Sequence, residues 1–279
     1  MIPAVLARAE PTTAPLVALI TGASSGIGEA TARRLAHEPD AQLVLVARRD
    51  DRLRELAASL PAPATHLAAD LTDPDAPERV LGHVGEHHGR LTLLVNNAGA
   101  GWPAAFGEGG YENVQRHMAL NFDAVLRLTE ALLPVLRSSA PSAIVNVSST
   151  AGRVARGGTG AYSASKFALA GWSDSLYAEE RANGVHVGLV LPGFVATEGF
   201  PQRELLERAL TRWAVSTPEA VAEAIVDAGL RRRPERYVPR AYGLLAAARV
   251  LAPWLVRRVS AGRVLSVLAP SGDAHDRSA

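Results

Sequence analysis

Tyr162 and Lys166 are the two residues of this sequence whose types and spacing best suit acid–base chemistry. A separation of four residues on a helix places both side chains on one face, within reach of each other. A phenol has an ordinary pKa of about 10, and a nearby ammonium favours its phenolate, which moves the group toward the range useful for proton transfer. Because Lys166 is the only lysine of the chain, we expect a role that the larger guanidinium of arginine cannot fill. The spacing alone is also common on helix surfaces, so other residues must support this interpretation.

A glycine-rich segment at residues 21–28 (TGASSGIG) has the composition of a phosphate-binding loop. It follows an apolar run and precedes a segment with helical spacing, so it predicts a tight turn between a strand and a helix. Glycine lets the backbone approach a pyrophosphate, and the amides at a helix start hold its charge. A turn without any ligand would use the same glycines, and the spacing differs from the G-x-G-x-x-G fingerprint. The expected cofactor contacts in this loop are Gly22, Ser24, Ser25, Gly26, Ile27 and Gly28.

Two arginines follow the second apolar run, at the place where an NAD enzyme usually offers an acid to the ribose 2′-hydroxyl. Arg48 and Arg49 would instead bind the 2′-phosphate of NADP through charge-assisted hydrogen bonds. The sequence therefore predicts NADP(H) in preference to NAD(H), and a solvated helix start capped by one of the next two aspartates is the alternative. Asp70 ends the next short run, where we expect it to hydrogen-bond the adenine amino group, with Leu71 beside it.

The order of apolar runs and helical segments predicts an α/β fold. Continuous apolar runs, typical of strands buried on both faces, occur at 16–20, 43–47, 91–95, 143–147 and 185–191. Segments with helical spacing alternate with them at 26–36, 51–59, 75–87, 112–137 and 161–182. Two short strands fit at 65–68 and 236–238, and Thr217-Pro218-Glu219 has the pattern of a helix start. We expect a single-domain, Rossmann-type, doubly wound parallel sheet flanked by helices.

Composition divides the chain into a core and three flanking segments. We expect a flexible tail over 1–14, the NADP-binding catalytic domain over 15–240, a basic, apolar helical extension over 241–270 and a disordered tail over 271–279. Residues 231–270 hold nine Arg against one acid, a local charge of +8 in a chain of net charge +1. The extension could cover the substrate site, enter a subunit interface or, through 241–268, lie on an anionic membrane.

The same composition excludes several classes of function. A net charge of +1 is too small to indicate a nucleic-acid-binding protein. Cysteine is absent, which rules out thiol nucleophiles and Cys-ligated zinc and agrees with a cytoplasmic location. His83, Glu86 and His87 match an inverted zinc-protease pattern, but Gly85 interrupts it. The segment also lies on the side of the predicted sheet that faces away from the glycine loop, so we expect no metal site. No G-x-S-x-G elbow follows a strand, which argues against a serine hydrolase.

Ser149 stands thirteen residues before Tyr162, at the end of the fifth predicted strand (143–147), where open α/β sheets bind ligands. With this serine in place, the chain resembles the short-chain dehydrogenase/reductase family over residues 16–238. The resemblance rests on TGxxxGxG at 21–28, NNAG at 96–99, a lone Asn at 121, a Ser at 149 and YxxxK at 162–166. Several separate motifs in one order carry more weight than any of them alone.

The resemblance implies a role for each of four residues. Tyr162 would be the general acid that protonates a carbonyl oxygen, or the base in the reverse direction. Lys166 would hold the nicotinamide ribose hydroxyls and lower the tyrosine pKa, and Ser149 would hydrogen-bond the substrate oxygen. Asn121 would order a water that connects Lys166 to solvent, with a capping or turn role as the alternative. The implied reaction is hydride transfer between NADP(H) and a carbonyl or an alcohol, and the rival interpretation is an NADP(H)-binding scaffold or sensor without turnover.

The resemblance also implies contacts around the nicotinamide and between subunits. The turn after the fourth strand is expected first of all to stabilise the sheet. Further cofactor contacts are expected in this turn and in the loop after the sixth strand, at Asn97, Ala98, Gly99, Pro192, Gly193, Val195 and Thr197. Aromatic residues in two loops predict an apolar pocket for a lipophilic ketone or aldehyde, lined by Trp102, Phe106, Phe194 and Phe200. Ordinary packing of these loops is the alternative. Family members usually pair through the helices that hold Asn121 and Tyr162, so we expect a homodimer or homotetramer.

Overall fold

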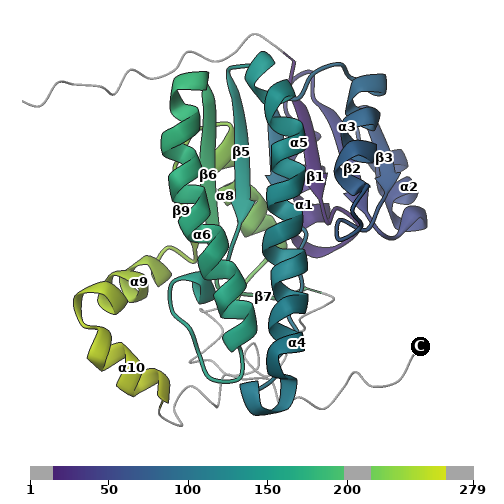
Figure 1. The fold of residues 1–279 in the computed structure, drawn as a ribbon. Coiled ribbons are helices and arrows are strands. Elements are labelled where there is room, and N and C mark those ends of the chain that lie inside the picture. The colour runs from purple at the N-terminus through teal and green to yellow at the C-terminus, as the bar shows by residue number, and fades with distance from the viewer. Residues whose placement is uncertain (1–14, 198–214, 262–279) are drawn as a thin grey trace, which may run out of the picture.

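The computed structural model describes residues 15–197 and 215–261, in which a seven-stranded parallel sheet carries helices on both faces (Figure 1). The strands are β1 (Val17–Thr21), β2 (Gln42–Ala47), β3 (Ala64–Ala68), β4 (Leu93–Asn96), β5 (Ser142–Val147), β6 (Val185–Pro192) and β9 (Glu235–Val238). Their order across the sheet is β3-β2-β1-β4-β5-β6-β9, and every neighbouring pair is parallel. The strands predicted from the apolar runs are confirmed. Phe200 and the tails at 1–14 and 271–279 lie outside the described residues.

The strands are continuous apolar runs because each has a core on both of its faces. Successive side chains of a strand point to opposite faces, and β2 shows the consequence. Leu43 and Leu45 belong to one core cluster, whereas Val44 and Val46 belong to the other, and all four are fully buried. Burial on both faces favours apolar residues at every position instead of at alternate ones.

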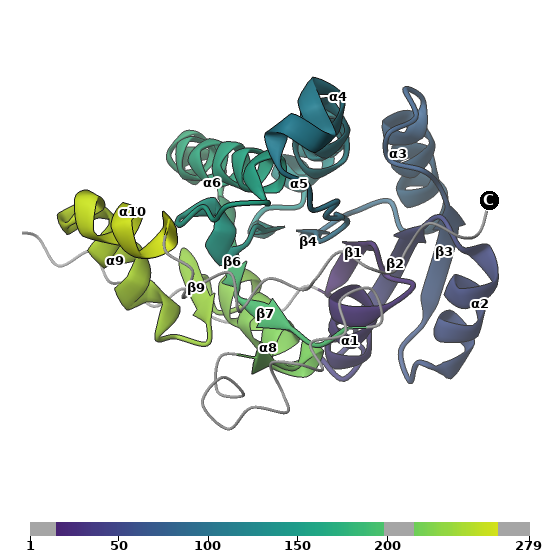
Figure 2. The same ribbon diagram turned by 90° about the horizontal axis from the view of Figure 1, so that it is seen from below.

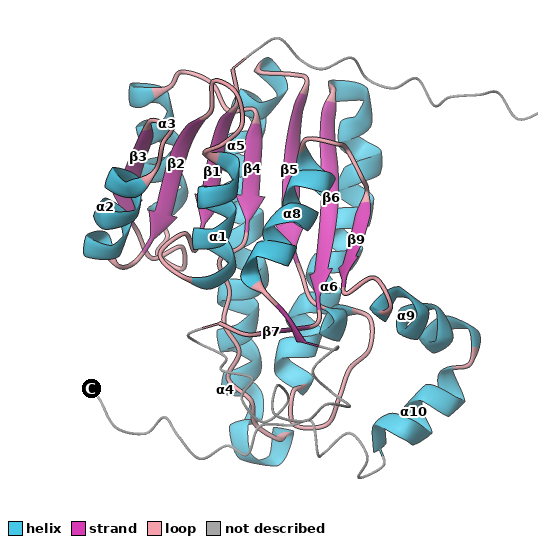
Figure 3. Cartoon of the chain, turned by 180° about the vertical axis from the view of Figure 1, so that it is seen from behind, coloured by secondary structure: helices cyan, strands magenta, loops and turns pink. Residues whose placement is uncertain are grey.

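Two layers of helices enclose the sheet (Figures 2 and 3). The layer over one face consists of α1 (Gly26–Leu35), α2 (Asp50–Ser59) and α8 (Pro218–Gly229). The layer over the other consists of α3 (Ala76–His87), α5 (Ala124–Ser138) and α6 (Gly160–Glu180). Thr217 caps α8, since its side chain accepts a hydrogen bond from the amide of Ala220, as the sequence predicts. This is the doubly wound arrangement expected from the alternation of strands and helices.

The helical segment predicted over 112–137 is confirmed, but a π-helical turn that the sequence did not predict divides it. The chain forms α4 (Phe106–Met118), one π-helical turn η1 (Ala119–Asp123) and then α5. Asn121 lies in this turn and is fully buried, with its side-chain amide bonded to the backbone of Ala100. A wide turn of this kind is frequent at functional sites, and here it points one amide out of the helix toward a loop.

The remaining elements are short. Two-residue strands β7 (Phe194–Val195) and β8 (Val215–Ser216) pair with each other, and their length gave no periodic signal in the sequence. Short 3-10 turns η2 (Thr150–Gly152) and η3 (Arg181–Asn183) precede and follow α6. The predicted helical extension contains α9 (Tyr242–Leu251) and α10 (Pro253–Ala261), which stand beside the end of the sheet (Figure 1).

The extension exposes many apolar side chains. The most exposed, each with at least two thirds of its surface in contact with solvent, are Leu244, Val250, Leu251 and Trp254. Arg257 and Arg258 are also exposed on α10, so the segment combines apolar and cationic groups as its composition indicates. Within residues 15–197 and 215–261, no helix is long and apolar enough to cross a membrane.

Candidate active site

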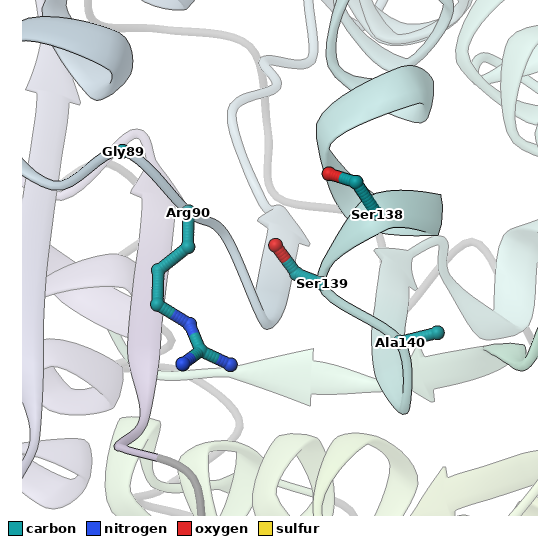
Figure 4. A pocket seen from close by; sticks show the side chains of 5 residues that line it. All are labelled: Gly89, Arg90, Ser138, Ser139 and Ala140. Carbon is teal, nitrogen blue, oxygen red and sulfur yellow. The ribbon is translucent and has the colours of Figure 1, made fainter.

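The expected site residues gather beyond the carboxyl ends of the central strands. Strand order reverses between β1 and β4, and the crevice outside such a reversal is where open α/β sheets bind ligands. A pocket of about 280 Å³ lies at the other end, where β4 and β5 begin, and is lined by Gly89, Arg90 and residues 138–140 (Figure 4). None of those residues belongs to the predicted site, so the two features are separate.

The glycine loop between β1 and α1 has a backbone that only glycine adopts readily. Gly22 and Gly26 have φ values of +67° and +56°, in the left-handed region. At Gly28 a Cβ would lie 2.2 Å from the carbonyl oxygen of Gly22, so no side chain fits there. Ser25 precedes α1 without a side-chain cap, and Ile27 packs against the core. The first amides of α1 therefore meet no capping side chain and can bind an anion such as a pyrophosphate.

The turn after β4 braces this loop. The hydroxyl of Thr21 accepts hydrogen bonds from the amides of Asn97 and Ala98, at 2.9 and 3.0 Å. The side-chain amide of Asn97 donates to the carbonyl of Thr21, also at 2.9 Å. These bonds join the ends of two neighbouring strands and agree with the expectation that the turn steadies the sheet. Its cofactor contacts remain a prediction.

Arg49 folds back over the glycine loop. Its guanidinium donates to the hydroxyl of Ser25 at 2.7 Å and to the hydroxyl of Ser24 at 3.2 Å. Ser24 is buried, whereas Arg49 is exposed. The arginine therefore places a positive charge at the mouth of the loop, where an anionic cofactor would meet it.

Arg48 is exposed beside Asp70 at the end of β3. One guanidinium nitrogen lies 3.9 Å from Oδ2 of Asp70, and three quarters of the arginine side chain is in solvent. Asp70 accepts hydrogen bonds from the amide and hydroxyl of Thr72, and these bonds, assisted by Arg48, hold the pKa of the carboxyl below its ordinary value. Leu71 is buried next to it. Both predicted arginines are therefore accessible beside the ends of β2 and β3, and their contact with a cofactor remains a prediction.

Lys166 is buried inside the site. Its ammonium donates to the carbonyl of Val147 at 2.9 Å and lies 5.9 Å from the ring centre of Tyr162. Gly99 provides the space beside it, because a Cβ there would lie 3.3 Å from Nζ and 2.9 Å from Oδ1 of Asn121. Burial lowers the pKa of Lys166 to about 8. The predicted pair of Tyr162 and Lys166 is thus brought together on α6.

Tyr162 has a phenol whose ionisation is resisted by burial. Burial raises the pKa of Tyr162, and a hydrogen bond with Ser149 and the positive charge of Arg156 oppose that rise. The hydroxyl of Ser149 also accepts from the amide of Ala151 at 3.1 Å and lies 3.3 Å from the carbonyl oxygen of Pro192, to which it donates. The ends of β5 and β6 therefore hold Ser149 against the phenol. Arg156 was not predicted as part of this site.

Asn121 connects the π turn to the loop after β4. Its side chain bonds both the amide and the carbonyl of Ala100, at 3.0 and 2.9 Å, and donates to the hydroxyl of Ser165 at 3.2 Å. The side chain thus has three protein partners within the site. The predicted role in ordering a water remains a prediction.

His117 is a second residue that the sequence analysis missed. It is fully buried, its Nδ1 donates to the carbonyl of Asn113 at 2.8 Å, and its Nε2 accepts from the amide of Trp102 at 3.0 Å. These two bonds require a neutral imidazole, and burial lowers the pKa of His117, which favours that form. Its ring centre lies 6.1 Å from that of Tyr162, so the histidine holds the Trp102 loop beside the phenol.

The loop after β6 closes the other side of the crevice. Thr197 lies against Gly26, with its methyl group 3.2 Å from where a Cβ would be. Gly193 lies under the ring of Tyr242, and a Cβ there would come within 2.4 Å of that ring. Val195 is buried in β7. The predicted loop therefore reaches the glycine loop at one point and the start of α9 at another.

Only part of the predicted apolar wall faces the site. Trp102 and Phe194 are half-buried, and the guanidinium carbon of Arg156 stands 4.7 Å from the ring centre of Phe194. Phe106, by contrast, is 75% exposed at the first residue of α4, where no packed wall forms. Phe200 lies outside the described residues.

The histidine cluster that matched a zinc pattern lies on α3. Nε2 of His83 is 3.0 Å from the hydroxyl of Thr65, and the rings of His83 and His87 are 4.3 Å apart. Burial lowers the pKa of His83, with help from the neighbouring histidines. In the part of the chain that the structure describes, no three His, Asp or Glu side chains converge as metal ligands.

Comparison with known proteins agrees with this geometry. Residues 16–205 match the short chain dehydrogenase family. The chain belongs to the short-chain dehydrogenase family. A short-chain dehydrogenase of Streptomyces avermitilis, known from its crystal structure, superimposes with a TM-score of 0.73 at 30% identity, which covers 90% of this chain and all of that one.

Two relatives support the same assignment. An oxidoreductase of Staphylococcus epidermidis is 35% identical over 196 residues, which is 68% of this chain and 85% of the relative. A 3-oxoacyl-[acyl-carrier-protein] reductase of rhamnolipid biosynthesis in Pseudomonas aeruginosa is 33% identical over 241 residues, or 83% and 90%. This short-chain dehydrogenase is therefore an NAD(P)-dependent oxidoreductase.

The close approach at Gly28 predicts opposite effects for one substitution at two positions of this dehydrogenase. Gly28→Ala forces a Cβ against the backbone of Gly22, so we expect a lower unfolding temperature and at least about tenfold weaker NADPH binding. Gly85→Ala is the matched control, because a Cβ there meets nothing within 4 Å and alanine favours the helix by roughly 0.5–1 kcal/mol. Thermal unfolding and fluorescence titration measure both effects. Equal shifts in the two variants would contradict the argument.

The buried ammonium predicts how stability depends on pH. In the unfolded chain Lys166 keeps its ordinary pKa of 10.5, and in the fold its pKa is about 8. Between these values the unfolded chain binds more protons, so the contribution of Lys166 to stability rises with pH, by on the order of 3 kcal/mol in full. Relative to wild type, Lys166→Met should therefore be most stable below pH 8 and should lose that advantage toward pH 10.5. Urea unfolding of both proteins across this range measures the difference, and a constant difference would be evidence against the shift.

Proposed function

We propose that this protein interconverts a carbonyl compound and an alcohol with NADP(H), and that Tyr162 is the general acid or base. The observation that carries the proposal is the buried Lys166 ammonium next to a phenol that Ser149 hydrogen-bonds. This group of side chains stands at the strand ends beside an uncapped helix start suited to a pyrophosphate. The chemistry and the cofactor site therefore share one crevice.

The reduction requires one hydride and one proton per carbonyl. A bound nicotinamide supplies the hydride. Tyr162 donates its proton to the carbonyl oxygen, and Ser149 hydrogen-bonds that oxygen and so fixes where the carbonyl carbon lies. Lys166, held by Val147, stabilises the phenolate that remains, since its ammonium lies on the same side of α6. In the opposite direction Tyr162 accepts the proton of the alcohol.

The substrate that fits this wall has an apolar body. Trp102 and Phe194 are half-buried aromatic side chains in the loops after β4 and β6, and a hydrogen bond to His117 holds the backbone of Trp102 in place. Apolar pockets with a few polar groups are typical of sites for lipophilic small molecules. We infer that the substrate is a lipophilic ketone or aldehyde, or the matching alcohol.

A scaffold or sensor that binds NADP(H) without turnover is the alternative function. It would keep the glycine loop and the two arginines, but it would not require a buried ammonium near a phenol that Ser149 hydrogen-bonds. Oxidation of NADPH in the presence of ketones, aldehydes and quinones separates the two functions. Tight binding without turnover across that panel would favour the sensor.

We infer that α9 and α10 pack against a further surface. Their exposed apolar residues exceed what a solvated helix pair needs, and a second copy of this chain in a dimer or tetramer would cover them. The arginines of α10 support a peripheral membrane surface as the alternative. Both arrangements are compatible with a cytoplasmic enzyme.

Replacement of Tyr162 by Phe tests the chemistry. The variant keeps the ring and loses only the proton donor, so turnover should fall by at least about a thousandfold while NADPH binding changes less than about twofold. Tyr177→Phe is the matched control, because this half-buried tyrosine lies on the same helix away from the crevice, against His186. Steady-state rates and fluorescence titration give the two quantities. An active Tyr162→Phe enzyme would overturn the mechanism.

The arginines at the adenosine end predict the choice of cofactor. We expect NADPH to bind at least about tenfold more tightly than NADH, since one hydrogen-bonded charge pair is worth about 1.5–3 kcal/mol. Arg48→Gln should remove most of that preference and leave NADH affinity within about twofold. Arg54→Gln, an exposed arginine of α2 paired with Asp50, should leave both affinities unchanged. Equal affinities of the wild type for the two cofactors would exclude the assignment.

A further inference from the structure

Arg156 lies in the segment between η2 and α6, on the substrate side of the crevice. Its guanidinium stacks on the ring of Phe194, with the carbon 4.7 Å from the ring centre. Its positive charge acts on the phenols of Tyr162 and Tyr242, which come from the start of α6 and the start of α9. One aromatic ring therefore stacks on the cation, and two phenols from other segments lie within its electrostatic influence.

Arg156 is half-buried, and its guanidinium stacks on the ring of Phe194. Partial burial lowers the pKa of the guanidinium, because it disfavours the charged form. A stack on one aromatic ring uses none of the five N–H donors of an arginine. Over residues 15–197 and 215–261 no carboxylate forms an ion pair with it. The N–H donors that the stack leaves available can therefore bind an anion.

Arg153, three residues earlier, shows what a structural arginine looks like in the same segment. It pairs with Glu235 at 2.7 Å and with Asp174 at 3.4 Å, so it joins the segment to β9 and α6. The charge of Arg153 is thus used inside the protein. The charge of Arg156 faces the reacting phenol, and no such role is visible for it in the described residues.

The anion that Arg156 suits is not part of the adenosine end of the cofactor. Arg48 and Arg49 stand at that end, beside β2 and the glycine loop. Arg156 instead stands over Phe194, which follows Gly193 in the loop whose Pro192 carbonyl bonds Ser149. Its neighbours are therefore the groups that bind the reacting carbonyl.

We propose that Arg156 binds a carboxylate of the substrate, so that the preferred substrates are apolar oxo acids or the corresponding hydroxy acids. This rests on the proposed function and narrows it, because an apolar body would lie on Trp102 and Phe194 while the carboxylate meets the guanidinium. A planar guanidinium binds a carboxylate through two parallel hydrogen bonds, which also orients the molecule. The distance between carboxylate and carbonyl in the substrate would then decide whether the carbonyl reaches Tyr162.

A binding experiment tests this without any need for turnover. The protein saturated with NADPH is titrated calorimetrically with octanoate and with octanamide, which differ in charge but hardly in shape. We expect octanoate to bind at least about tenfold more tightly in the wild type, and Arg156→Gln to abolish the difference. Arg181→Gln, an exposed arginine of η3, removes the same charge elsewhere and should keep the difference. Equal binding of acid and amide by the wild type, or an unchanged preference in Arg156→Gln, would overturn the proposal.

Kinetics separate substrate binding from an effect on the phenol. Reduction of 2-, 4-, 6- and 8-oxodecanoate is compared with reduction of their methyl esters. Arg156→Gln should raise KM for the preferred acid at least about tenfold more than KM for its methyl ester. Any change in kcat or in its pH profile that the lost charge beside Tyr162 causes should be the same for acid and ester. Equal loss for acid and ester with a shifted pH profile would show that the arginine only tunes Tyr162, which contradicts the proposal. If Arg156→Gln fails to fold, Arg156→Lys and the acid-to-amide ratio of the wild type still decide.

Discussion

An ammonium almost completely removed from water is the feature on which the rest of the site depends. A buried charge is costly unless hydrogen bonds compensate it, and Lys166 meets the carbonyl of Val147 at the end of β5. Gly99 leaves room beside it in the turn after β4. Helix α6, strand β5 and that turn must therefore keep their relative positions, and Tyr162 and Ser149 stand on two of the same segments. The relative positions of Tyr162 and Lys166 are therefore fixed by the packing around the buried lysine.

Most of the fold could be predicted because its causes are local. Strands with a core on both faces must be apolar at every position, and the runs show this directly. The glycine loop could be predicted because the backbone angles at Gly22 and the close contact at Gly28 favour glycine over every other residue type at these positions. Tyr162 and Lys166 were visible because one helical turn separates them. In each case neighbouring positions contain the physical reason.

The missed features depend on contacts between distant positions. The π turn at Asn121 forms where a side chain reaches the backbone of Ala100, 21 residues away, and nothing in the apolar spacing indicates it. The role of His117 could not be predicted, because it depends on hydrogen bonds with the backbone of Trp102 and Asn113 that only the fold reveals. Arg156 is one of 28 arginines, and only the fold places its charge over Phe194. Phe106 was predicted to line the apolar pocket because it is close in sequence to Trp102, but its side chain is exposed.

The ring of Tyr242 over Gly193 links the extension to the loop that adjoins Ser149. Since the ring leaves no space for a Cβ, a movement of α9 toward this loop would displace the loop. A molecule that binds the outer face of α9 and α10 would therefore affect the crevice through this contact.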